Sequence, residues 1–443
     1  MKPSKIIPFF VLLCISLGTL WYASPFHHSS AAEESENVFA SPTYANYQRQ
    51  LLNFLQGHPL YLSIKHKGTT PFHLQMAQLI NSIEQPLGDD AQQQRAYHER
   101  WVEELRKTIS FTSFQLAENR DVHQFLQDLV QWIFLKVDLH GAFNSFFYSI
   151  APQWQEENFF SYIQDTLRLL KKNPELVSPP NDPSHEDHFL HGNLPSLLFS
   201  LPPTNVIRIA NPLGDFSRIG IWPWYPLQIH PEFLLFLKTQ PSHLYVNLMK
   251  RHGEEKYASY TLESLEQAFP KLYVVTLDKD SPFYWQKSLE EPIPSTLFKE
   301  QFLTHLFAEN SSFFWSSHLD IPSWKQELNH LIQTIHNRYF PSFQTFNREE
   351  RLDFIELTYL EILNTLVHKW HPASMNITCR YNIDRGPSLS ILWMLQKTQT
   401  QRPEIASELL APPLLIDNRP SHSARISRFT SAARRFLEDP ERL

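Results

Sequence analysis

The stretch Met375–Lys397 reads MNITCRYNIDRGPSLSILWMLQK and decides the fold that we expect for this chain. Residues 375–378 favour a short buried strand, and the apolar spacing over 388–398 predicts a helix. The polar residues between them predict a tight loop. In this loop Cys379 stands six positions before Arg385, and Asp384 directly precedes the arginine. The helix N-terminus therefore points back at the cysteine.

This spacing suits a loop that binds phosphate. Five residues between the cysteine and the arginine let the backbone curl until its N–H groups point inward at an anion. A helix N-terminus and a nearby arginine stabilise a thiolate, which is the nucleophilic form of cysteine. Arg385 would grip two phosphate oxygens, and Asp384 would protonate the leaving oxygen or orient a water. This chemistry requires no metal and no other cofactor. The alternative is that Cys379 is a small buried hydrophobic residue at a strand end.

The loop C-R-Y-N-I-D-R resembles the C-K-S-G-K-D-R-T loop of bacterial effector phosphoinositide phosphatases and of inositol polyphosphate 4-phosphatases. The resemblance implies an α/β domain of cysteine-phosphatase type acting on phosphoinositides or inositol phosphates. It implies that Cys379 is the nucleophile that forms a phosphocysteine and that Arg385 clamps the phosphate. It also implies that Asp384 is the general acid and that Arg380 replaces a lysine that helps to hold substrate phosphates.

Three positions depart from that pattern. Gly386 stands where a hydroxyl residue usually follows the arginine, and Ile383 replaces the second lysine of the loop. Asn382 replaces the loop glycine, although asparagine also reaches left-handed backbone angles. These departures favour an alternative function, an exported interaction protein whose phosphatase-like loop is catalytically inactive and binds anions or nothing.

Composition limits the class of protein. The 443 residues are enough for two domains of ordinary size, and a hydrophobic content of 42% supplies a substantial core. Only 10 residues are glycine, and no Gly-rich nucleotide loop of the GxGxxG or Walker type is present. The net charge of −7 argues against nucleic acid as the main partner. We expect a phosphorylated small molecule or a lipid headgroup instead.

The N-terminus has the pattern of an export signal. Lys2 and Lys5 precede the apolar run Ile6–Tyr22, and small residues before Ala32 suit a signal-peptidase cut. We expect residues 1–31 to be a signal peptide, with an uncleaved signal anchor as the alternative. The chain would then be secreted or periplasmic. For a phosphoinositide enzyme, export implies action in a host cell, at a host membrane surface.

Removal of this segment would change the number of cysteines in the mature chain. The chain has two cysteines, and Cys14 would leave with the signal peptide. Cys379 would then be the single thiol of the mature chain, which excludes an internal disulfide and a thiolate metal site.

Residues 47–192 are expected to form a helical region. Apolar residues recur there at helical spacing, most clearly over 122–137, and the stripes are typical of core packing. A Pro-rich break follows at 178–183. Beyond it, His185, His188 and His191 resemble a metal cluster, but their proline-flanked context favours a solvated loop.

Residues 201–443 are expected to form an α/β domain with a mostly parallel sheet. Strand candidates at 243–249 and 272–277 flank a helix at 260–269, which is the pattern of a βαβ unit. A further strand is predicted at 205–210 and another near the C-terminus at 414–416. The other predicted helices are 295–306, 323–338, 348–369 and a basic C-terminal helix.

Ligands of parallel sheets collect at the carboxyl ends of the strands. Lys250 and Arg251 follow one predicted strand there and would bind substrate, while Asp278 and Asp280 follow another and are rival general acids to Asp384. The alternative for the two aspartates is a role in the turn L-D-K-D-S-P. The arginines of the last helix either line an anionic site or form a solvated basic face; they are Arg428, Arg434 and Arg435.

Overall fold

A five-stranded sheet lies at the centre of the fold, in the order β1-β2-β9-β5-β6. The computed structural model describes residues 42–60, 71–85, 91–115, 120–150, 158–173, 193–214, 228–287, 291–308, 311–417 and 419–438. Strands β2, β9, β5 and β6 run parallel, and β1 pairs antiparallel with β2 at one edge. The strands are β1 (Ser196–Leu201), β2 (Thr204–Arg208), β5 (His243–Asn247), β6 (Leu272–Thr276) and β9 (Ser374–Thr378).

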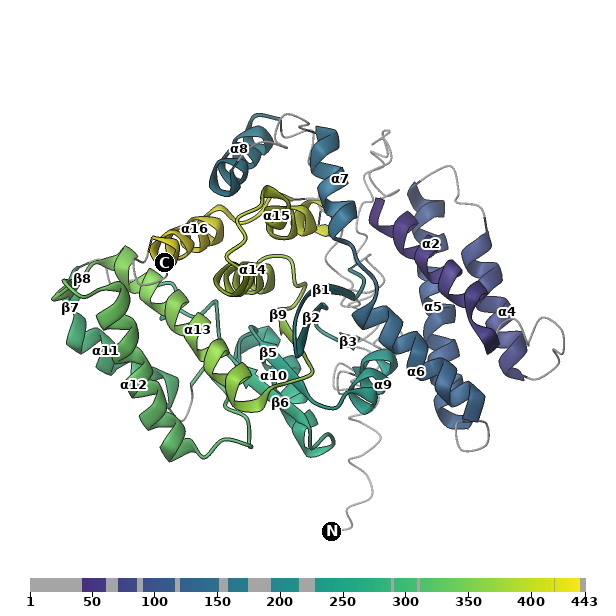
Figure 1. Cartoon of the computed structure of the whole chain (residues 1–443), viewed down its shortest axis with the longest axis horizontal. Coiled ribbons are helices and arrows are strands. Elements are labelled where there is room, and N and C mark those ends of the chain that lie inside the picture. The colour runs from purple at the N-terminus through teal and green to yellow at the C-terminus, as the bar shows by residue number, and fades with distance from the viewer. Residues whose placement is uncertain are drawn as a thin grey trace, which may run out of the picture. The chain divides into compact units, whose positions relative to one another are not determined.

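The connections place helices on both faces of this sheet. Helix α9 (Pro231–Thr239) leads from β2 to β5, and α10 (Lys256–Ser264) leads from β5 to β6 in the same direction. Helix α13 (Arg348–Trp370) returns from β6 to β9 in the opposite direction. Because crossover connections are right-handed, α13 must lie on the face opposite α9 and α10. Figure 1 shows α13 and α14 (Arg385–Thr398) on one side of the strands and α9 on the other.

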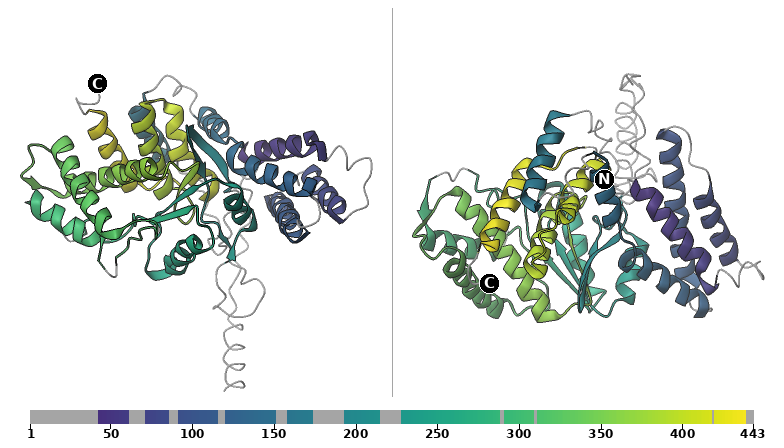
Figure 2. Two further views of the ribbon diagram at one scale, coloured as in Figure 1. Left: turned by 60° about the horizontal axis from the view of Figure 1, so that its bottom comes forward. Right: turned by 45° about the horizontal axis from the view of Figure 1, so that its top comes forward.

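Helix α14 is enclosed by other helices. It packs against α13 and also contacts α15 (Pro403–Asp417) and α16 (Ser423–Leu437). Ten consecutive residues of α14, from Gly386 to Leu395, are buried. Two further views of this layer are given in Figure 2. The remaining helices on this side are α11 (Ser295–Leu306) and α12 (Ile321–Tyr339).

Two short strand pairs lie outside the five-stranded sheet. They are β3 (Leu213–Gly214) with β4 (Gln228–Ile229), and β7 (Ile293–Pro294) with β8 (Thr345–Phe346).

The N-terminal part of the described chain is helical between residues 42 and 172. Helix α6 packs against α9 and reaches β1 and β2. The described residues belong to one compact unit, Asn37–Leu443, so these helices share it with the sheet. The helices are α2 (Pro42–Gly57), α4 (Pro71–Glu84), α5 (Ala91–Gln115), α6 (Arg120–Leu135), α7 (His140–Ile150) and α8 (Phe159–Lys172).

The expected class is confirmed at this level: the described residues form a mixed α/β fold with fourteen α-helices and a mostly parallel sheet. The predicted strands near 205, 243, 272 and 375 are confirmed as β2, β5, β6 and β9, and the βαβ unit is β5-α10-β6. Helix α10 begins earlier than predicted, at Lys256.

The predicted strand at 414–416 is wrong, because these residues belong to α15. A short apolar run looks the same in a buried strand and in a buried helix, and eleven of the fifteen residues of α15 are buried. Pro412 and Pro413 lie within this helix although neither has an N–H to donate. The edge strand β1 was not predicted.

Two predicted features lie outside the described residues. These are the signal segment 1–31, with Cys14, and the loop that carries His185, His188 and His191. Of the helices that the structure describes, none is both long and apolar enough to cross a membrane.

Candidate functional site

The loop after β9 is held open by contacts to its carbonyl groups. Three successive carbonyls face outward and accept hydrogen bonds. The backbone N–H of Asn211 donates to Arg380 O at 3.1 Å, the side chain of Asn193 donates to the carbonyl of residue 381, and Arg208 Nη2 donates to Asn382 O at 3.3 Å. Because the carbonyls are bound on the outside, the loop can direct its amides inward.

Five successive amides of the same loop, those of residues 382–386, lack partners in the described part of the chain. No described residue accepts a hydrogen bond from the backbone N–H groups of residues 382–386. Pro387 has no N–H, and the first amide with an acceptor in α14 is that of Ser388, which donates to Asp384 O at 3.1 Å. The Asp384 side chain does not cap the helix. Such a run of unpaired amides at a helix N-terminus is a site for an anion.

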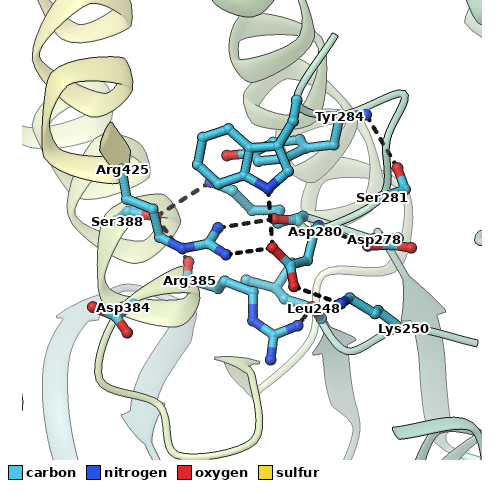
Figure 3. A network of polar contacts seen from close by, with 12 residues as sticks. Leu248, Lys250, Asp278, Asp280, Ser281, Tyr284, Asp384, Arg385, Ser388 and Arg425 are labelled. Atoms are coloured by element: carbon cyan, nitrogen blue, oxygen red, sulfur yellow. Dashed lines mark hydrogen bonds and ion pairs between the residues drawn. The ribbon is translucent and has the colours of Figure 1, made fainter. Parts of the chain in front are cut away.

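Arg385 presents one free edge of its guanidinium group. Its Nη1 donates to Leu248 O at 3.0 Å and to Glu255 Oε2 at 2.9 Å, and its Nη2 donates to Glu255 Oε1 (Figure 3 draws the contact to Leu248). The Nε–H and the second Nη2–H have no partner among the described residues. These two donors lie on the same edge of the planar group and point in parallel, as bidentate binding of two phosphate oxygens requires.

Glu255 fixes the charge and the direction of Arg385. Burial alone would lower the pKa of Arg385, but the ion pair with Glu255 outweighs burial and raises it. Burial would likewise raise the pKa of Glu255, but Arg385 outweighs that effect and the pKa is lowered. Glu255 also accepts a hydrogen bond from the backbone N–H of Lys250 at 2.8 Å. Both groups are therefore ionised at neutral pH, and the arginine is oriented before any ligand binds.

Cys379 lies between two arginines. Its thiol is buried and free of disulfide, and it interacts electrostatically with both Arg385 and Arg208. Burial lowers the pKa of Arg208 to about 10, so this guanidinium stays charged at neutral pH. We did not predict Arg208 as a site residue. The sequence feature that could have indicated it is an arginine at the end of an apolar strand, which neighbours the cysteine strand in a parallel sheet.

Asp384 is paired rather than free. Both of its carboxylate oxygens accept hydrogen bonds from Arg419, in the connection between α15 and α16. Arg419 also donates to Asp417 Oδ2 at 2.6 Å, and the two carboxylates outweigh burial and raise its pKa. A leaving group would have to compete with Arg419 for Asp384.

Asp280 lies at the centre of a cationic cluster, as Figure 3 shows. Its carboxylate accepts from Lys250 Nζ at 2.7 Å, Arg425 Nη2 at 2.8 Å and Trp285 Nε1 at 2.9 Å. Burial would raise its pKa, but these donors together with Arg385 outweigh burial and lower it to about 2. A carboxylate that is ionised at neutral pH has no proton to give, so Asp280 orients Lys250 and Arg425 instead.

Asp278 is the carboxyl group whose surroundings best suit an acid. Its side chain is fully buried, and its Oδ1 accepts a hydrogen bond from the backbone N–H of Asp280 at 2.7 Å. Its Oδ2 has no hydrogen-bond partner among the described residues. Burial raises its pKa, and the opposing effects, which include the positive charge of Arg385, do not cancel that rise. Asp278 therefore holds a proton more readily than an ordinary aspartate.

The other predicted basic residues separate into different environments. Arg251 binds both carboxylate oxygens of Glu263 and two backbone carbonyls, so its donors are used to anchor the chain. Arg380 is 29% exposed, and its Nη1 lies 3.9 Å from the carboxylate of Glu254. Arg428 is buried, with its guanidinium 3.6 Å from the ring centre of Tyr284. Arg434 and Arg435 line a groove elsewhere.

The side chain of Asn382 fills the space next to Gly386. Asn382 has a left-handed backbone with φ of 51°. A Cβ atom on Gly386 would lie 1.7 Å from Asn382 Oδ1 and 2.8 Å from the carbonyl oxygen of Ile377. Real Cβ atoms do not approach other atoms so closely. The asparagine side chain therefore fills the space that a side chain at position 386 would need, and the two departures are one structural change.

The cluster around Asp280 predicts a pH effect on stability. Because the folded pKa of about 2 lies below the unfolded value of 3.8, Asp280 contributes stability that is present above pH 3.8 and lost as the pH falls towards 2. We expect Asp280→Asn to be destabilising at about pH 6, and we expect this difference to shrink at about pH 2.5. Denaturant unfolding at both pH values measures it. Asp165→Asn is the control, because Asp165 is half-exposed on α8 and its partner Arg168 is exposed. An equal difference at both pH values for Asp280→Asn would contradict the prediction.

The site thus belongs to an α/β protein that carries a candidate anion-binding loop at the carboxyl edge of a parallel sheet. No family model matches the chain, and no curated protein or solved structure shows significant similarity to it. Among the described residues, no three His, Cys, Asp or Glu side chains are grouped as metal ligands. The geometry of the site is therefore the basis for a function.

Proposed function

We propose that this chain is a cysteine-dependent phosphatase that cleaves phosphate monoesters through a phosphocysteine intermediate. One observation carries the proposal: a thiol, a run of unpaired amides and the free edge of an arginine lie in a single loop. These are the nucleophile, the cradle and the clamp that phosphoryl transfer to cysteine requires. The resemblance of the loop supports a phosphoinositide or an inositol phosphate as the substrate, and an α/β domain of cysteine-phosphatase type.

The reaction has two steps. The thiolate of Cys379 attacks phosphorus, and the bond from phosphorus to the leaving oxygen breaks. That oxygen takes a proton, for which Asp278 is the best-suited donor in its surroundings, because burial raises its pKa. Water then attacks the phosphocysteine, the P–S bond breaks, and inorganic phosphate leaves while the carboxylate regains a proton. Arg385 and the loop amides stabilise the negative oxygens in both steps.

The proposed setting comes from the sequence. The N-terminal segment 1–31 supports export to a secreted or periplasmic location, by a cleaved signal or as an anchored protein. The substrate class then supports action at a host membrane surface. The proposal involves neither nucleic acid nor a cofactor.

A second function has a specific observation in its favour. Asp384 is paired with Arg419, Asp280 is ionised, and Gly386 cannot supply the hydroxyl group that assists a leaving thiolate. A loop of this kind would bind phosphate without turning it over. In that case the chain acts as an exported binding protein.

Protection of Cys379 from alkylation tests the loop directly. We expect vanadate or inorganic phosphate to slow alkylation of Cys379 by at least about tenfold, because an oxyanion bound to the amides and Arg385 covers the thiol. Mass spectrometry of the peptide that contains Cys379 gives the rate. Sulfate-free buffer is the reference. The unprocessed chain, residues 1–443, is used, so that Cys14 in the same sample is the internal control. A rate that does not respond to either oxyanion contradicts both the enzymatic and the binding functions.

A further inference from the structure

A large groove lies along α16, apart from the Cys379 loop. Its volume is about 920 Å³, within the range of small-molecule sites. Its walls come from α8, the end of α12, one residue of α13 and α16. Figure 1 shows α8 next to α16. No residue of the loop 379–386 lines it, so the proposed phosphatase site does not explain it. We call it the α16 groove.

One face of α16 lines this groove with hydroxyl groups. They belong to Ser423, Ser427, Thr430 and Ser431, whose spacing places them along one side of the helix. Ile426 also lines the groove, whereas Arg425 and Arg428 reach other partners. Arg425 reaches Asp280, and Arg428 reaches Glu356. One side of α16 therefore contributes residues to the surroundings of the Cys379 loop, and another side lines the α16 groove.

Guanidinium groups gather at the far end of the groove. Arg434 lines it there together with the acidic Glu438, and Arg338 lines the groove from the end of α12. No described carboxylate forms an ion pair with Arg434, whose guanidinium lies 5.1 Å from the ring centre of Phe160. Arg435 also lines the groove, but its Nε donates to Asp353 Oδ2 at 3.0 Å. Ser431 donates to the same oxygen at 3.0 Å, so Asp353 is satisfied within the wall. Of the two arginines at this end, Arg434 is therefore the one better able to bind an anion.

We propose that the α16 groove binds a small phosphorylated polyol. Its phosphate would pair with Arg434, because guanidinium groups match phosphate oxygens. Its hydroxyls would pair with the row on α16, because serine and threonine both donate and accept hydrogen bonds. An apolar ligand would cover the hydroxyls of Ser423, Ser427 and Thr430 without offering them a partner, which is costly. An extended acidic peptide would need cations along the whole groove, whereas Arg434 and Arg435 lie at one end.

Calorimetric titration of the full chain carrying Cys379→Ser tests the proposal without turnover at the loop. The probes are glucose 6-phosphate and myo-inositol 1-phosphate, with glucose, myo-inositol and an acidic peptide for comparison. We expect the phosphorylated probes to bind. We expect Arg434→Glu to weaken binding by about tenfold or more, since it removes one charge-assisted contact and adds a repulsive one. Ser427→Leu is expected to weaken it through the hydroxyl row.

The matched control is Arg402→Glu, an equivalent charge reversal at an exposed arginine that does not line the groove. It should leave the affinity unchanged. Repeating the titration on a chain that also carries Arg385→Lys, which removes the bidentate clamp of the loop, separates the two sites, because groove binding does not use Arg385. Binding that Arg385→Lys abolishes, or that Arg434→Glu does not weaken, overturns the proposal. Absence of binding, or binding of the acidic peptide alone, overturns it as well. None of these outcomes depends on whether Cys379 is catalytic.

Discussion

A chain carrying Cys379→Ser is expected to release inorganic phosphate from phosphate monoesters at least about a thousandfold more slowly than the wild-type chain, as loss of a covalent nucleophile does elsewhere. The serine hydroxyl fits the space of the thiol but is a far weaker acid, so Arg385 and Arg208 do not convert it into a nucleophile. Phosphate release from water-soluble phosphoinositides and inositol phosphates, followed over time, measures the effect.

The unprocessed chain, residues 1–443, offers a matched control for this substitution. In that chain Cys14→Ser makes the same chemical change at the other cysteine and should leave the rate unchanged. A Cys379→Ser chain that hydrolyses substrate as fast as wild type would rule out the phosphocysteine mechanism. If the wild-type chain shows oxyanion protection of Cys379 and no hydrolysis of any phosphoester, the binding function is the correct one.

Gly386→Ala is expected to destabilise the fold by about 1–3 kcal/mol, the usual cost of forcing extra volume into a packed interior. The added Cβ would collide with Asn382 Oδ1 and with the carbonyl oxygen of Ile377. Alanine is the better helix former by about 1 kcal/mol, so a helix without this collision would become more stable. A lower free energy of unfolding would show that the packing collision dominates. A higher one would show that the gain in helix propensity dominates. Urea unfolding measures it.

The double variant Asn382→Gly, Gly386→Ala shows whether the asparagine is the cause. Glycine suits the left-handed backbone at position 382 and removes the colliding atoms. We expect the double variant to be more stable than the sum of the two single changes implies, since residues in contact are not additive. Additive effects would mean that the collision with Ile377 O alone sets the cost.

The elements of the sheet were predictable because they are local patterns. Strands β5 and β6 are short runs rich in apolar and aromatic residues, whereas β9 alternates polar and apolar residues. The helix between β5 and β6 buries Ala258 and Leu262 at helical spacing. The carboxyl-edge rule then brought Lys250, Asp278 and Asp280 into the neighbourhood of Arg385. The run at 414–416 failed because burial on all sides removes the periodicity that separates helix from strand.

The electrostatics of the site were not predictable, since they depend on pairs that are distant in the sequence. Arg385 is oriented by Glu255, 130 positions away, and Asp384 is held by Arg419 from the last helical connection. A sequence shows which residues carry charge, but not which opposite charge they meet. For the same reason Asp278 and Asp280, two positions apart, have pKa values shifted in opposite directions.

The contact between Asn382 and Gly386 also limits how the loop can be redesigned. A Cβ atom at position 386 would meet both the side chain of Asn382 and the backbone carbonyl oxygen of Ile377. A serine or threonine at 386 therefore needs two adjustments at once, a smaller or rotated side chain at 382 and a shift of the backbone at 377. Engineering a hydroxyl group next to Arg385 is thus a problem of several positions and not of one.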